Sequence, residues 1–572
     1  MVEREHMLRR EEAALAEVGR TDFSRGAARA LAAVFVATVL APAVVQSVRD
    51  VREHLVGRRA SAWPQALDIA GSLPAAGKRF AEAEGSAFGR LLAANRLLQR
   101  DMDRYEDALE DESVLGKAVR PKVQALLAGW LGAGNEEAYV GREGWLFYRP
   151  GFDYVTRPGF LEARELHRRA ASGSEWQRVP QPDPRMAILE FHEQLAARDV
   201  RLVVMPTPVK PVIEPERMAA AYEGGASAVQ NPSYPRFVSD LERAGVWVFD
   251  PSEAMLGTRR GSGRPAYLAT DTHWTPQAME AAAQGLAAFI GDHVPLPPLP
   301  PTGQQSAAVE VENSGDIAVM LDLPESHSLL RPERVRVEQV RRRDGGLWRA
   351  DTSADVLVLG DSFSNVYSLE AMGWGESAGL VERLSLALDR PVDRMVRNDA
   401  GAWATRALLA RELERGRDRL AGKRVVVWQF AMRELAVGDW RRIPMRLGEG
   451  RPARFFVPEP GAERIVTGTV LEASPVPRPG TVPYKDHIMS VHLADLEDEN
   501  GPIENGQAVV YMWSMRDNVW TPAARYRPGR HVRARLRPWA DVEGRLGGVN
   551  RSDLDDAGLM LAEPCWAEGG VD

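Results

Sequence analysis

The chain has almost no cysteine and little lysine. Its 572 residues include a single cysteine, Cys565, so no disulfide can form within the chain and no cysteine-based metal site or redox pair is possible. A protein without disulfides is compatible with any compartment, so the cysteine count does not decide localisation. The net charge is -8 at pH 7, which excludes the basic footprint typical of a nucleic-acid-binding protein.

Hydrophobic residues make up 44% of the chain and charged residues 27%, a composition typical of a large folded protein. On length alone, about two to four domains are expected. The basic residues are almost all arginine, which we attribute to a GC-rich genome rather than to function.

One uncharged apolar run near the amino terminus bears on localisation. The run covers Ala30 to Val48, and a membrane-spanning helix needs about 20 mostly apolar residues. Three interpretations compete: an uncleaved signal anchor, a cleaved signal peptide with a long leader, and a buried core helix. Arg20, Arg25 and Arg29 suit retention of residues 1–29 in the cytoplasm, although further arginines after the run weaken this bias. We favour a transmembrane anchor over residues 30–48.

Residues 49–136 are predicted to be helical, because apolar residues recur there at helical spacing. They form either a stalk that lifts the next domain from the membrane or helices packed against that domain. The charged stretch Gln99–Ser113 is interpreted as a solvated helix face.

Residues 137–445 alternate between strand-like and helix-like segments, and Pro295–Gly303 reads as a linker or surface crossover. Such alternation is typical of a mostly parallel sheet with helices on both faces, an α/β fold. The expected strands are Arg201–Met205, Val246–Phe249, Val356–Leu359 and Val425–Phe430, and the expected helices are Pro235–Ala244, Pro276–Ile290 and Ser377–Leu388.

Two short motifs carry the candidate chemistry. Asp271–Thr275 comes first, and Gly360–Ser364 follows about ninety residues later, directly after the apolar run Val356–Leu359. An Asp can orient a His, and that His can deprotonate a Ser that is otherwise weakly nucleophilic. Alone, each motif is as well explained by a turn or a helix cap. Open α/β sheets, however, place active sites at the carboxyl ends of their strands, where Ser362 is expected.

These motifs and their order resemble the SGNH hydrolase-like domain of the alginate O-acetyltransferases of the AlgX and AlgJ type. In ordinary SGNH esterases the Gly-Asp-Ser block comes near the start, whereas in this family the order is permuted, as here. The resemblance covers roughly Glu137 to Pro444. It extends to further segments that match family motifs: Tyr139–Tyr148, Val203–Lys210, Val425–Phe430 and Arg433–Leu435.

The resemblance implies a fold and a reaction. The fold is the flavodoxin-like SGNH sheet, and Ser362 forms an acetyl-enzyme intermediate with His273 as base and Asp271 as the residue that orients it. The oxyanion would be bound by the amide of Ser362, with Gly360 and Asn398 as further candidates.

Two basic residues have two interpretations each. Arg433 is a candidate for binding an acidic sugar or the oxyanion, or else a structural partner of Glu434. Lys210 has the same two interpretations, a substrate-binding role or a structural one.

The family also implies partners and a compartment. They are an exported polysaccharide as acceptor, a membrane-bound O-acyltransferase as acetyl donor, and a periplasmic catalytic domain anchored in the inner membrane. We expect no cofactor and no metal. Alternatives are an SGNH-type esterase with the same triad, a non-catalytic secretion protein, and a lipase-like enzyme. The last would normally show a Gly-x-Ser-x-Gly elbow, which is absent around Ser362.

Beyond Pro444 the helical periodicity fades. Short strand-like runs separated by Gly and Pro predict a small β-barrel or β-sandwich over residues 460–572. The runs are Arg464–Leu471, His487–His492, Gln507–Trp513 and Gly529–Arg537. Aromatic residues are dense here and could stack on sugar rings, although we favour a role in the domain core. They are Trp513, Trp520, Tyr526 and Trp539.

Overall fold

The computed structural model describes residues 24–55, 67, 72–82, 86–172, 179–222, 228–324, 327–398, 401–414, 416–448, 455–477, 479, 482, 484–503, 506–526, 529–554, 559 and 562–569. The chain divides into two compact units, Met1–Lys122 and Val123–Asp572. Each unit is described by itself.

Nearly all the described residues of the first unit are helical, as predicted. Helix α2 (Arg25–Leu55) contains a 28-residue stretch, Arg25–Arg52, that is long and apolar enough to cross a membrane, and the mean hydropathy of an 18-residue window within it is 2.1. Helix α3 (Ser72–Glu82) packs against α4 (Ala87–Glu112). Helix α5 (Val114–Leu131) continues into the second unit. The apolar run predicted over residues 30–48 lies inside α2, which continues beyond both ends of that run.

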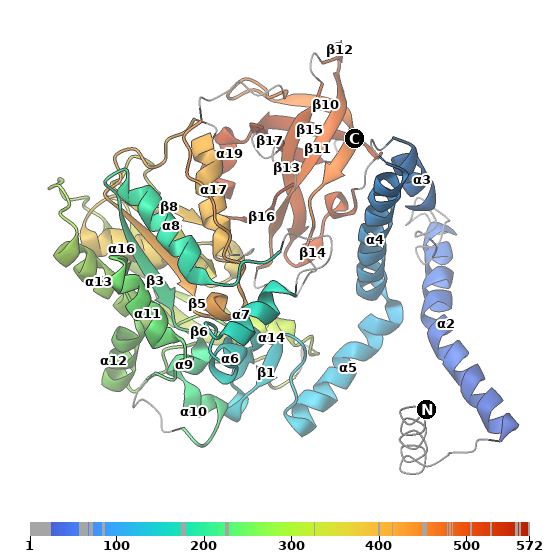
Figure 1. The fold of residues 1–572 in the computed structure, drawn as a ribbon, viewed down its shortest axis with the longest axis horizontal. Coiled ribbons are helices and arrows are strands. Elements are labelled where there is room, and N and C mark those ends of the chain that lie inside the picture. Colours follow the sequence, from blue (N-terminus) through green and yellow to red (C-terminus); the bar gives the residue numbers. More distant parts are fainter. Residues whose placement is uncertain are drawn as a thin grey trace, which may run out of the picture. The chain divides into compact units, whose positions relative to one another are not determined.

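In the second unit, a five-stranded parallel sheet lies among the helices of residues 137–445, and the carboxyl-terminal strands form a separate sheet (Figure 1). The strand order of the parallel sheet is β4-β3-β9-β7-β8. Every residue of β7 and β9 is buried, which explains why β7 is a continuous apolar run and β9 is interrupted only by Gln429. The bounds are β3 (Arg201–Thr207), β4 (Trp247–Val248), β7 (Val356–Gly360), β8 (Asp393–Val396) and β9 (Val425–Ala431).

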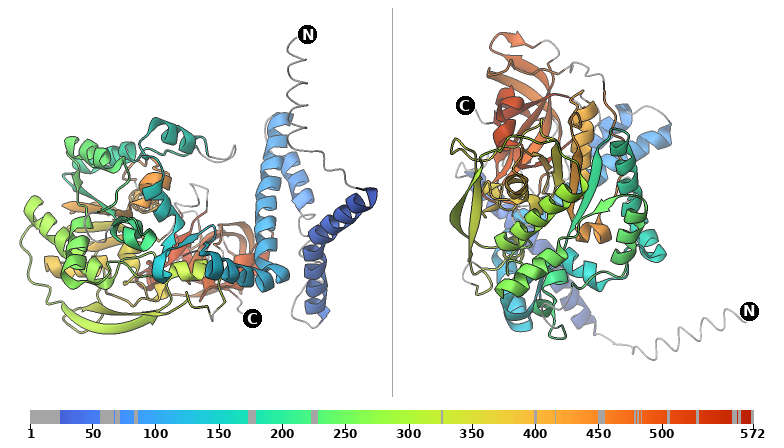
Figure 2. Two further views of the ribbon diagram at one scale, coloured as in Figure 1. Left: turned by 90° about the horizontal axis from the view of Figure 1, so that it is seen from below. Right: turned by 90° about the vertical axis from the view of Figure 1, so that its left-hand side faces the viewer.

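Helices cover both faces of this sheet (Figure 2), which confirms the predicted α/β class. On one face α13 (Pro276–His293) packs against α12 (Ser252–Ser262) and α16 (Leu380–Leu388). On the other, α8 (Pro184–Ala196) packs against α11 (Tyr234–Arg243), and Arg406 of α17 (Trp403–Glu414) stacks over Phe191 of α8. The predicted helices and strands correspond to these elements within a few residues at each end.

Several short elements were not predicted. Two antiparallel hairpins join β1 (Ala138–Val140) to β2 (Leu146–Tyr148) and β5 (Gln305–Asn313) to β6 (Glu333–Arg341). The remaining helices are short: α6 (Arg149–Thr156), α7 (Ala163–Ala170), α9 (Lys210–Ile213), α10 (Pro215–Met218), α14 (Asp316–Met320), α15 (Ser362–Asn365), α18 (Arg433–Val437), and the 3-10 turns η2 (Arg142–Gly144) and η3 (Glu370–Met372).

The carboxyl-terminal part is an all-β barrel, one of the two predicted forms. Strand β11 pairs with β10, β10 with β15, β15 with β17, β17 with β13, and β13 with β11, which closes the ring. Closure removes the free edges that an open sheet would expose. The elements are β10 (Arg464–Ala473), β11 (His487–Asp498), β12 (Gly501–Pro502), β13 (Ala508–Arg516), β14 (Val519–Trp520), η4 (Pro522–Arg525), β15 (His531–Pro538), α19 (Ala540–Leu546), β16 (Asn550–Ser552) and β17 (Pro564–Gly569).

Candidate active site

Four of the predicted site residues lie just past the carboxyl ends of the parallel strands. Ser362 follows β7, Asn398 follows β8, Arg433 follows β9 and Lys210 follows β3. Because parallel strands end at one edge of the sheet, these four positions share that edge, where open α/β sheets bind ligands.

Asp271 and His273 form a buried hydrogen-bonded pair. Nδ1 of His273 lies 2.6 Å from Oδ1 of Asp271, and both side chains are almost fully buried. The other oxygen of Asp271 accepts the indole N–H of Trp374 at 2.8 Å and the backbone N–H of Asp316 at 3.0 Å. An ionised Asp271 therefore fixes the imidazole with Nδ1 as the donor and Nε2 as the available base.

The two residues shift each other's pKa. Burial by itself would raise the pKa of Asp271, but the charge and hydrogen bond of His273 outweigh it and lower that pKa below its ordinary value. Burial opposes the charged imidazole, yet the carboxylate of Asp271 raises the pKa of His273 above its ordinary value. The pair thus stabilises the imidazolium that forms when the base takes a proton.

Asp316 is a third member of this cluster that the sequence did not reveal. Its Oδ1 accepts the backbone N–H of Thr272 at 2.6 Å, and its Oδ2 lies 3.8 Å from Nδ1 of His273. Burial, together with the nearby charge of Asp271, raises the pKa of Asp316 to about 6. No motif marks this residue, because it begins a five-residue helix 43 positions after His273.

The same three side chains offer ligand atoms within 4.8 Å of one another, as a metal site would. The oxygens of Asp271, however, already accept four N–H groups: the ring and backbone N–H of His273, the indole of Trp374 and the backbone of Asp316. A cation would have to displace these donors. The geometry therefore fits a hydrogen-bonded acid–base pair better than a metal centre.

The two sequence motifs are packed against each other despite their separation along the chain. The imidazole of His273 and the ring of Phe363 are 4.9 Å apart. The indole N–H of Trp274 donates to the carbonyl of Phe363 at 3.2 Å, and the hydroxyl of Tyr367 donates to the carbonyl of Trp274 at 2.6 Å. These contacts hold the turn that carries His273 against the helix that begins at Ser362.

The reactive atoms themselves are not hydrogen-bonded to each other. Nε2 of His273 is buried and has no hydrogen-bond partner within the described part of the chain, and Ser362 is 1% exposed. Catalytic hydrogen bonds are often loose without substrate and tighten in the complex. The nitrogen that would act as base is therefore available.

The backbone around Ser362 is held by polar contacts to β9. Asp361 caps α15 by accepting the N–H of Phe363 at 2.9 Å. Gln429 on β9 accepts the backbone N–H of Asp361 at 3.0 Å and the hydroxyl of Ser364 at 2.6 Å. A side chain at Gly360 would place its Cβ 2.4 Å from the Ser364 hydroxyl. Gly360 thus gives the turn the space it needs.

Arg433 lies beside the reactive residues with an unused donor. Its guanidinium carbon is 5.7 Å from the ring of Phe363 and 5.3 Å from that of Tyr148. Its buried Nη1 has no hydrogen-bond partner among the residues that the structure describes. Glu434 is the acceptor for the backbone N–H of Ala402 at 3.2 Å. Of the two interpretations of Arg433, the geometry favours a ligand-binding role over pairing with Glu434.

Of the two interpretations of Lys210, the contacts of its side chain favour the structural one. Its side chain is 3% exposed, and Nζ donates to the carbonyls of Leu146 at 2.7 Å and Ala269 at 3.2 Å. Burial lowers the pKa of Lys210 to about 8. The lysine thus ties β2 to the segment just before Asp271.

Asn398 lies where the sheet domain meets the barrel. Its backbone N–H donates to the side chain of Asn550 at 3.2 Å, and its Oδ1 accepts from Asn365 at 3.0 Å. Its Nδ2 lies 3.5 Å from the sulfur of Met372. The described contacts do not assign it to the oxyanion, and that role stays a prediction.

The aromatic residues of the barrel separate into two groups. Tyr526 is 6% exposed and Trp539 is 5% exposed, and each belongs to a buried core cluster. Their burial agrees with the core role that the sequence favoured for the barrel aromatics, because neighbouring side chains cover their faces. Trp513 and Trp520 are half-buried. Arg516 lies 4.3 Å over the ring of Trp513, and the indole N–H of Trp520 donates to Pro477.

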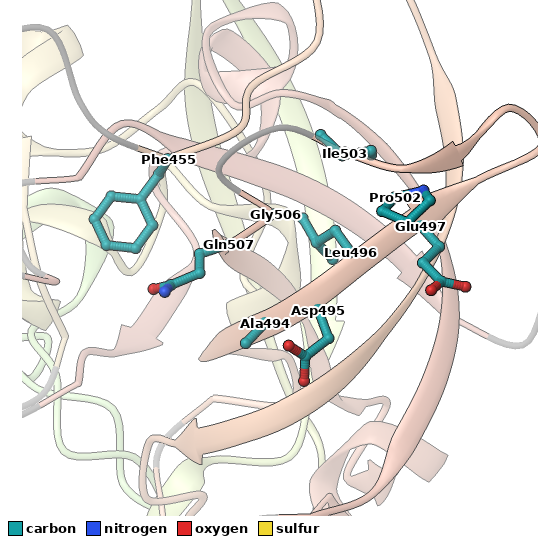
Figure 3. A pocket seen from close by; sticks show the side chains of 9 residues that line it. All are labelled: Phe455, Ala494, Asp495, Leu496, Glu497, Pro502, Ile503, Gly506 and Gln507. Atoms are coloured by element: carbon teal, nitrogen blue, oxygen red, sulfur yellow. The ribbon is translucent and has the colours of Figure 1, made fainter.

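A surface cavity of about 650 Å³ lies on the barrel rather than at the reactive residues (Figure 3). Its lining includes the carboxylates of Asp495 and Glu497 on β11, with Gln507 and Phe455 opposite. Two carboxylates would repel a polyanion. This cavity is therefore a poor place for an acidic polymer.

Comparison with known sequences places the sheet domain in a family. The family described as "SGNH hydrolase-like domain, acetyltransferase AlgX" matches residues 138–432. A probable alginate O-acetylase AlgJ of Pseudomonas syringae pv. tomato is 26% identical over 239 residues, which are 40% of this chain and 55% of the relative. The Pseudomonas fluorescens protein of the same name is 28% identical over 179 residues, 30% of this chain and 44% of that protein. The chain spans about half the length of the curated relatives it matches.

Solved structures include two similar chains. The O-acetyltransferase domain of Pseudomonas putida AlgJ has a TM-score of 0.39 and 22% identity, covering 52% of this chain and 92% of that one. Pseudomonas aeruginosa AlgX has a TM-score of 0.34 and 13% identity, covering 71% of this chain and 92% of that one.

Proposed function

The chain belongs to the family of SGNH hydrolase-like acetyltransferase domains of the AlgX type, and we propose that it transfers acetyl groups to hydroxyls of an exported polysaccharide. The names of its curated relatives, probable alginate O-acetylases, support an acidic, alginate-like acceptor. The observation that carries the proposal is the buried Asp271–His273 pair, whose free Nε2 is packed next to the turn of Ser362.

In the first half of the reaction, Nε2 of His273 takes the proton of the Ser362 hydroxyl while Oγ attacks the acetyl carbonyl carbon of the donor. Asp271 keeps the imidazole oriented and stabilises its positive charge. The imidazolium then gives the proton to the leaving group of the donor. The product is an acetyl ester on Ser362.

In the second half, a sugar hydroxyl attacks the acetyl-Ser362 ester and His273 takes its proton. The ester bond to Oγ breaks, and the imidazolium returns the proton to Ser362. The developing oxyanion would be bound by the backbone N–H of Ser362, with Asn398 as a further candidate. A preorganised donor of this kind contributes about 3 kcal/mol to the barrier reduction.

Arg433 is assigned to the acceptor. Its unpartnered Nη1 is buried beside Phe363, so a carboxylate that enters next to Ser362 would satisfy it. Arg forms bidentate contacts with carboxylates. An acidic sugar would thereby be held with a hydroxyl near the acyl carbon, and such positioning contributes on the order of 7–11 kcal/mol in favourable cases.

The remaining parts of the chain fit an extracytoplasmic enzyme. We propose that residues 1–29 are cytoplasmic, that the apolar part of α2 anchors the chain in the inner membrane, and that residues 137–445 work in the periplasm. A membrane-bound O-acyltransferase would supply the acetyl group. The barrel over residues 460–572 is proposed as an accessory acceptor surface through Trp513 and Trp520, its two half-buried candidates.

The test separates transfer from hydrolysis, since water and a sugar hydroxyl are equivalent nucleophiles for the same triad. Purified protein is incubated with an activated acetyl ester, with and without uronate oligosaccharides, and both free acetate and acetylated oligosaccharide are measured. We expect acceptor to speed deacylation and to carry the acetyl group. If free acetate is the main product with every polymer, and if the protein readily hydrolyses the acetyl esters of acetylated polymers, the protein is an esterase.

A further inference from the structure

Helix α5 carries a row of apolar side chains that face outward. Leu115, Val119, Val123, Leu126 and Trp130 recur every three or four residues, so they line one face of the helix. They are 44%, 48%, 50%, 53% and 85% exposed, respectively. An exposed row of this kind, here called the α5 stripe, is typical of an interaction surface.

The other side of the same helix is anchored. Ala128 is 5% exposed and belongs to a small core with Leu146 of β2 and with Ile317 and Leu321 of α14. Gln124, one turn earlier, is also buried. The carboxyl-terminal half of α5 therefore has a fixed inner face, and the α5 stripe is a second, opposite face rather than a misplaced core face.

The charges of α5 indicate a negatively charged binding partner. Residues Val114–Leu131 contain Lys117, Arg120 and Lys122 but no Asp or Glu, in a chain whose net charge is -8. All three basic side chains are exposed. Arg120 and Lys122 flank the stripe, whereas Lys117 lies on the side of Gln124. An apolar face flanked by basic side chains, with a Trp near one end, resembles helices that lie in the plane of a membrane interface. Anionic headgroups would pair with Arg120 and Lys122 while the stripe enters the acyl boundary.

We infer that the α5 stripe lies on the surface of the bilayer that α2 crosses, with anionic lipid as its ligand. Helix α2 is long and apolar enough to span a membrane, and it tethers α5 to the same bilayer through fewer than sixty residues. A protein that is held by a membrane-spanning helix and by a second, weaker interfacial contact binds the membrane more firmly than it would through either contact alone. The inference rests on α2 as an anchor and does not depend on acetyl transfer.

This contact would fix the distance between the reactive residues and the membrane surface. The inner face of α5 packs on α14, and α14 begins at Asp316, which contacts the Asp271–His273 turn. A helix held flat on the bilayer would therefore keep the strand-end edge of the sheet close to the membrane surface. That placement suits an enzyme whose acyl donor is itself in the membrane.

A fluorescent label on the full-length chain tests this. Leu126→Cys is labelled with an environment-sensitive dye, which is selective because the native Cys565 is fully buried. Val519→Cys, at an apolar position of the barrel that is 66% exposed, serves as the matched control. Both proteins are reconstituted into phosphatidylcholine vesicles with and without phosphatidylglycerol, and quenching by spin-labelled lipid is measured.

We expect the emission of the label at position 126 to shift to shorter wavelength and to be quenched several-fold more than that of the label at position 519. The effect should be larger with phosphatidylglycerol and should weaken with salt or with Lys117→Glu, Arg120→Glu and Lys122→Glu combined. Equal exposure to water at both positions would overturn the inference. A shielded label that lipid does not quench would assign the stripe to a protein partner instead, which also overturns it. If the chain does not float with the vesicles, α2 is not an anchor and the inference is overturned. Turnover of a small acetyl ester tests the proposed function separately.

Discussion

Asp271 and Asp316 are two buried carboxyl groups joined by a single backbone contact, in which the N–H of Asp316 donates to Oδ2 of Asp271 at 3.0 Å. Both acids act on His273, one through a hydrogen bond of 2.6 Å and one from 3.8 Å. Two negative charges this close to one imidazole favour its protonated form. The base of the proposed reaction is therefore tuned by two acids, of which the sequence motif contains only one.

Removal of the second charge should change the pH profile of acylation. In Asp316→Asn the remaining oxygen still accepts the N–H of Thr272, but the charge is gone. Because Asp316 helps to raise the pKa of His273, the acidic limb of kcat/KM should move to lower pH, by about one unit or less. The other charged groups around His273 are Asp271 and Arg433, with Lys210 acting through the acids. An acidic limb that stays in place would show that Asp316 has only a structural role.

The same substitution should stabilise the protein at neutral pH. The pKa of Asp316 is about 6 in the folded state and about 3.9 in the unfolded state. Between these two pH values the carboxyl group is mostly protonated in the folded state and mostly ionised in the unfolded state. The stability of the native protein therefore falls as the pH rises through this window. The Tm of Asp316→Asn relative to the native protein should rise from pH 4 to pH 6 and then stay constant. Melting curves across this range check it, and a constant difference in Tm from pH 4 to pH 6 would contradict it.

Trp374 should matter for catalysis although it does not reach the nucleophile. Its indole N–H donates to Asp271 at 2.8 Å, and a hydrogen bond to a charged group contributes about 1.5–3 kcal/mol. Trp374→Phe should slow acetylation of Ser362 by about tenfold or more, with the fold retained. Trp566→Phe is the control, since that buried indole N–H has no partner in the described part of the chain. Equal losses in both variants would point to general destabilisation.

Arg433 should affect transfer more than acylation. If it binds a carboxylate of the acceptor, Arg433→Gln should raise KM for uronate oligosaccharides by at least about tenfold, with a smaller effect on turnover of a neutral acetyl ester. Arg441→Gln, at an arginine stacked over Trp403 and paired with Asp439, controls for loss of a nearby charge. A fall of about 100-fold or more in acylation itself would instead assign Arg433 to the oxyanion.

The sequence predicted the central fold because buried parallel strands leave an unmistakable pattern. The runs that precede Thr207 and Gly360 are continuous and apolar, the run that precedes Met432 is interrupted only by Gln429, and the ends of these runs locate the site. Strand β8 escaped because it is four residues long and begins with a charged pair, Asp393 and Arg394. The β5–β6 hairpin escaped because much of it is exposed and alternates valine with charged residues.

Within the site, the residues that stand in a sequence motif could be predicted, whereas residues that only the fold brings to the site could not. Asp271, His273 and Ser362 stand in short recognisable blocks. Asp316 and Trp374 reach Asp271 only because the chain folds back on itself, from 45 and 103 positions away. The sequence left two interpretations of Lys210 open, because the two backbone carbonyls that hold its side chain are brought to it only by the fold.

The most direct test is the intact mass of the protein after brief incubation with an activated acetyl ester. The account predicts one added acetyl group on the native protein, located on Ser362 by peptide mapping. The adduct should be absent in Ser362→Ala, strongly slowed in His273→Gln, and unaffected in Ser368→Ala. Uronate oligosaccharide should then discharge it with appearance of acetylated sugar. An adduct that forms equally in Ser362→Ala would contradict the assignment of the nucleophile and the proposed mechanism with it.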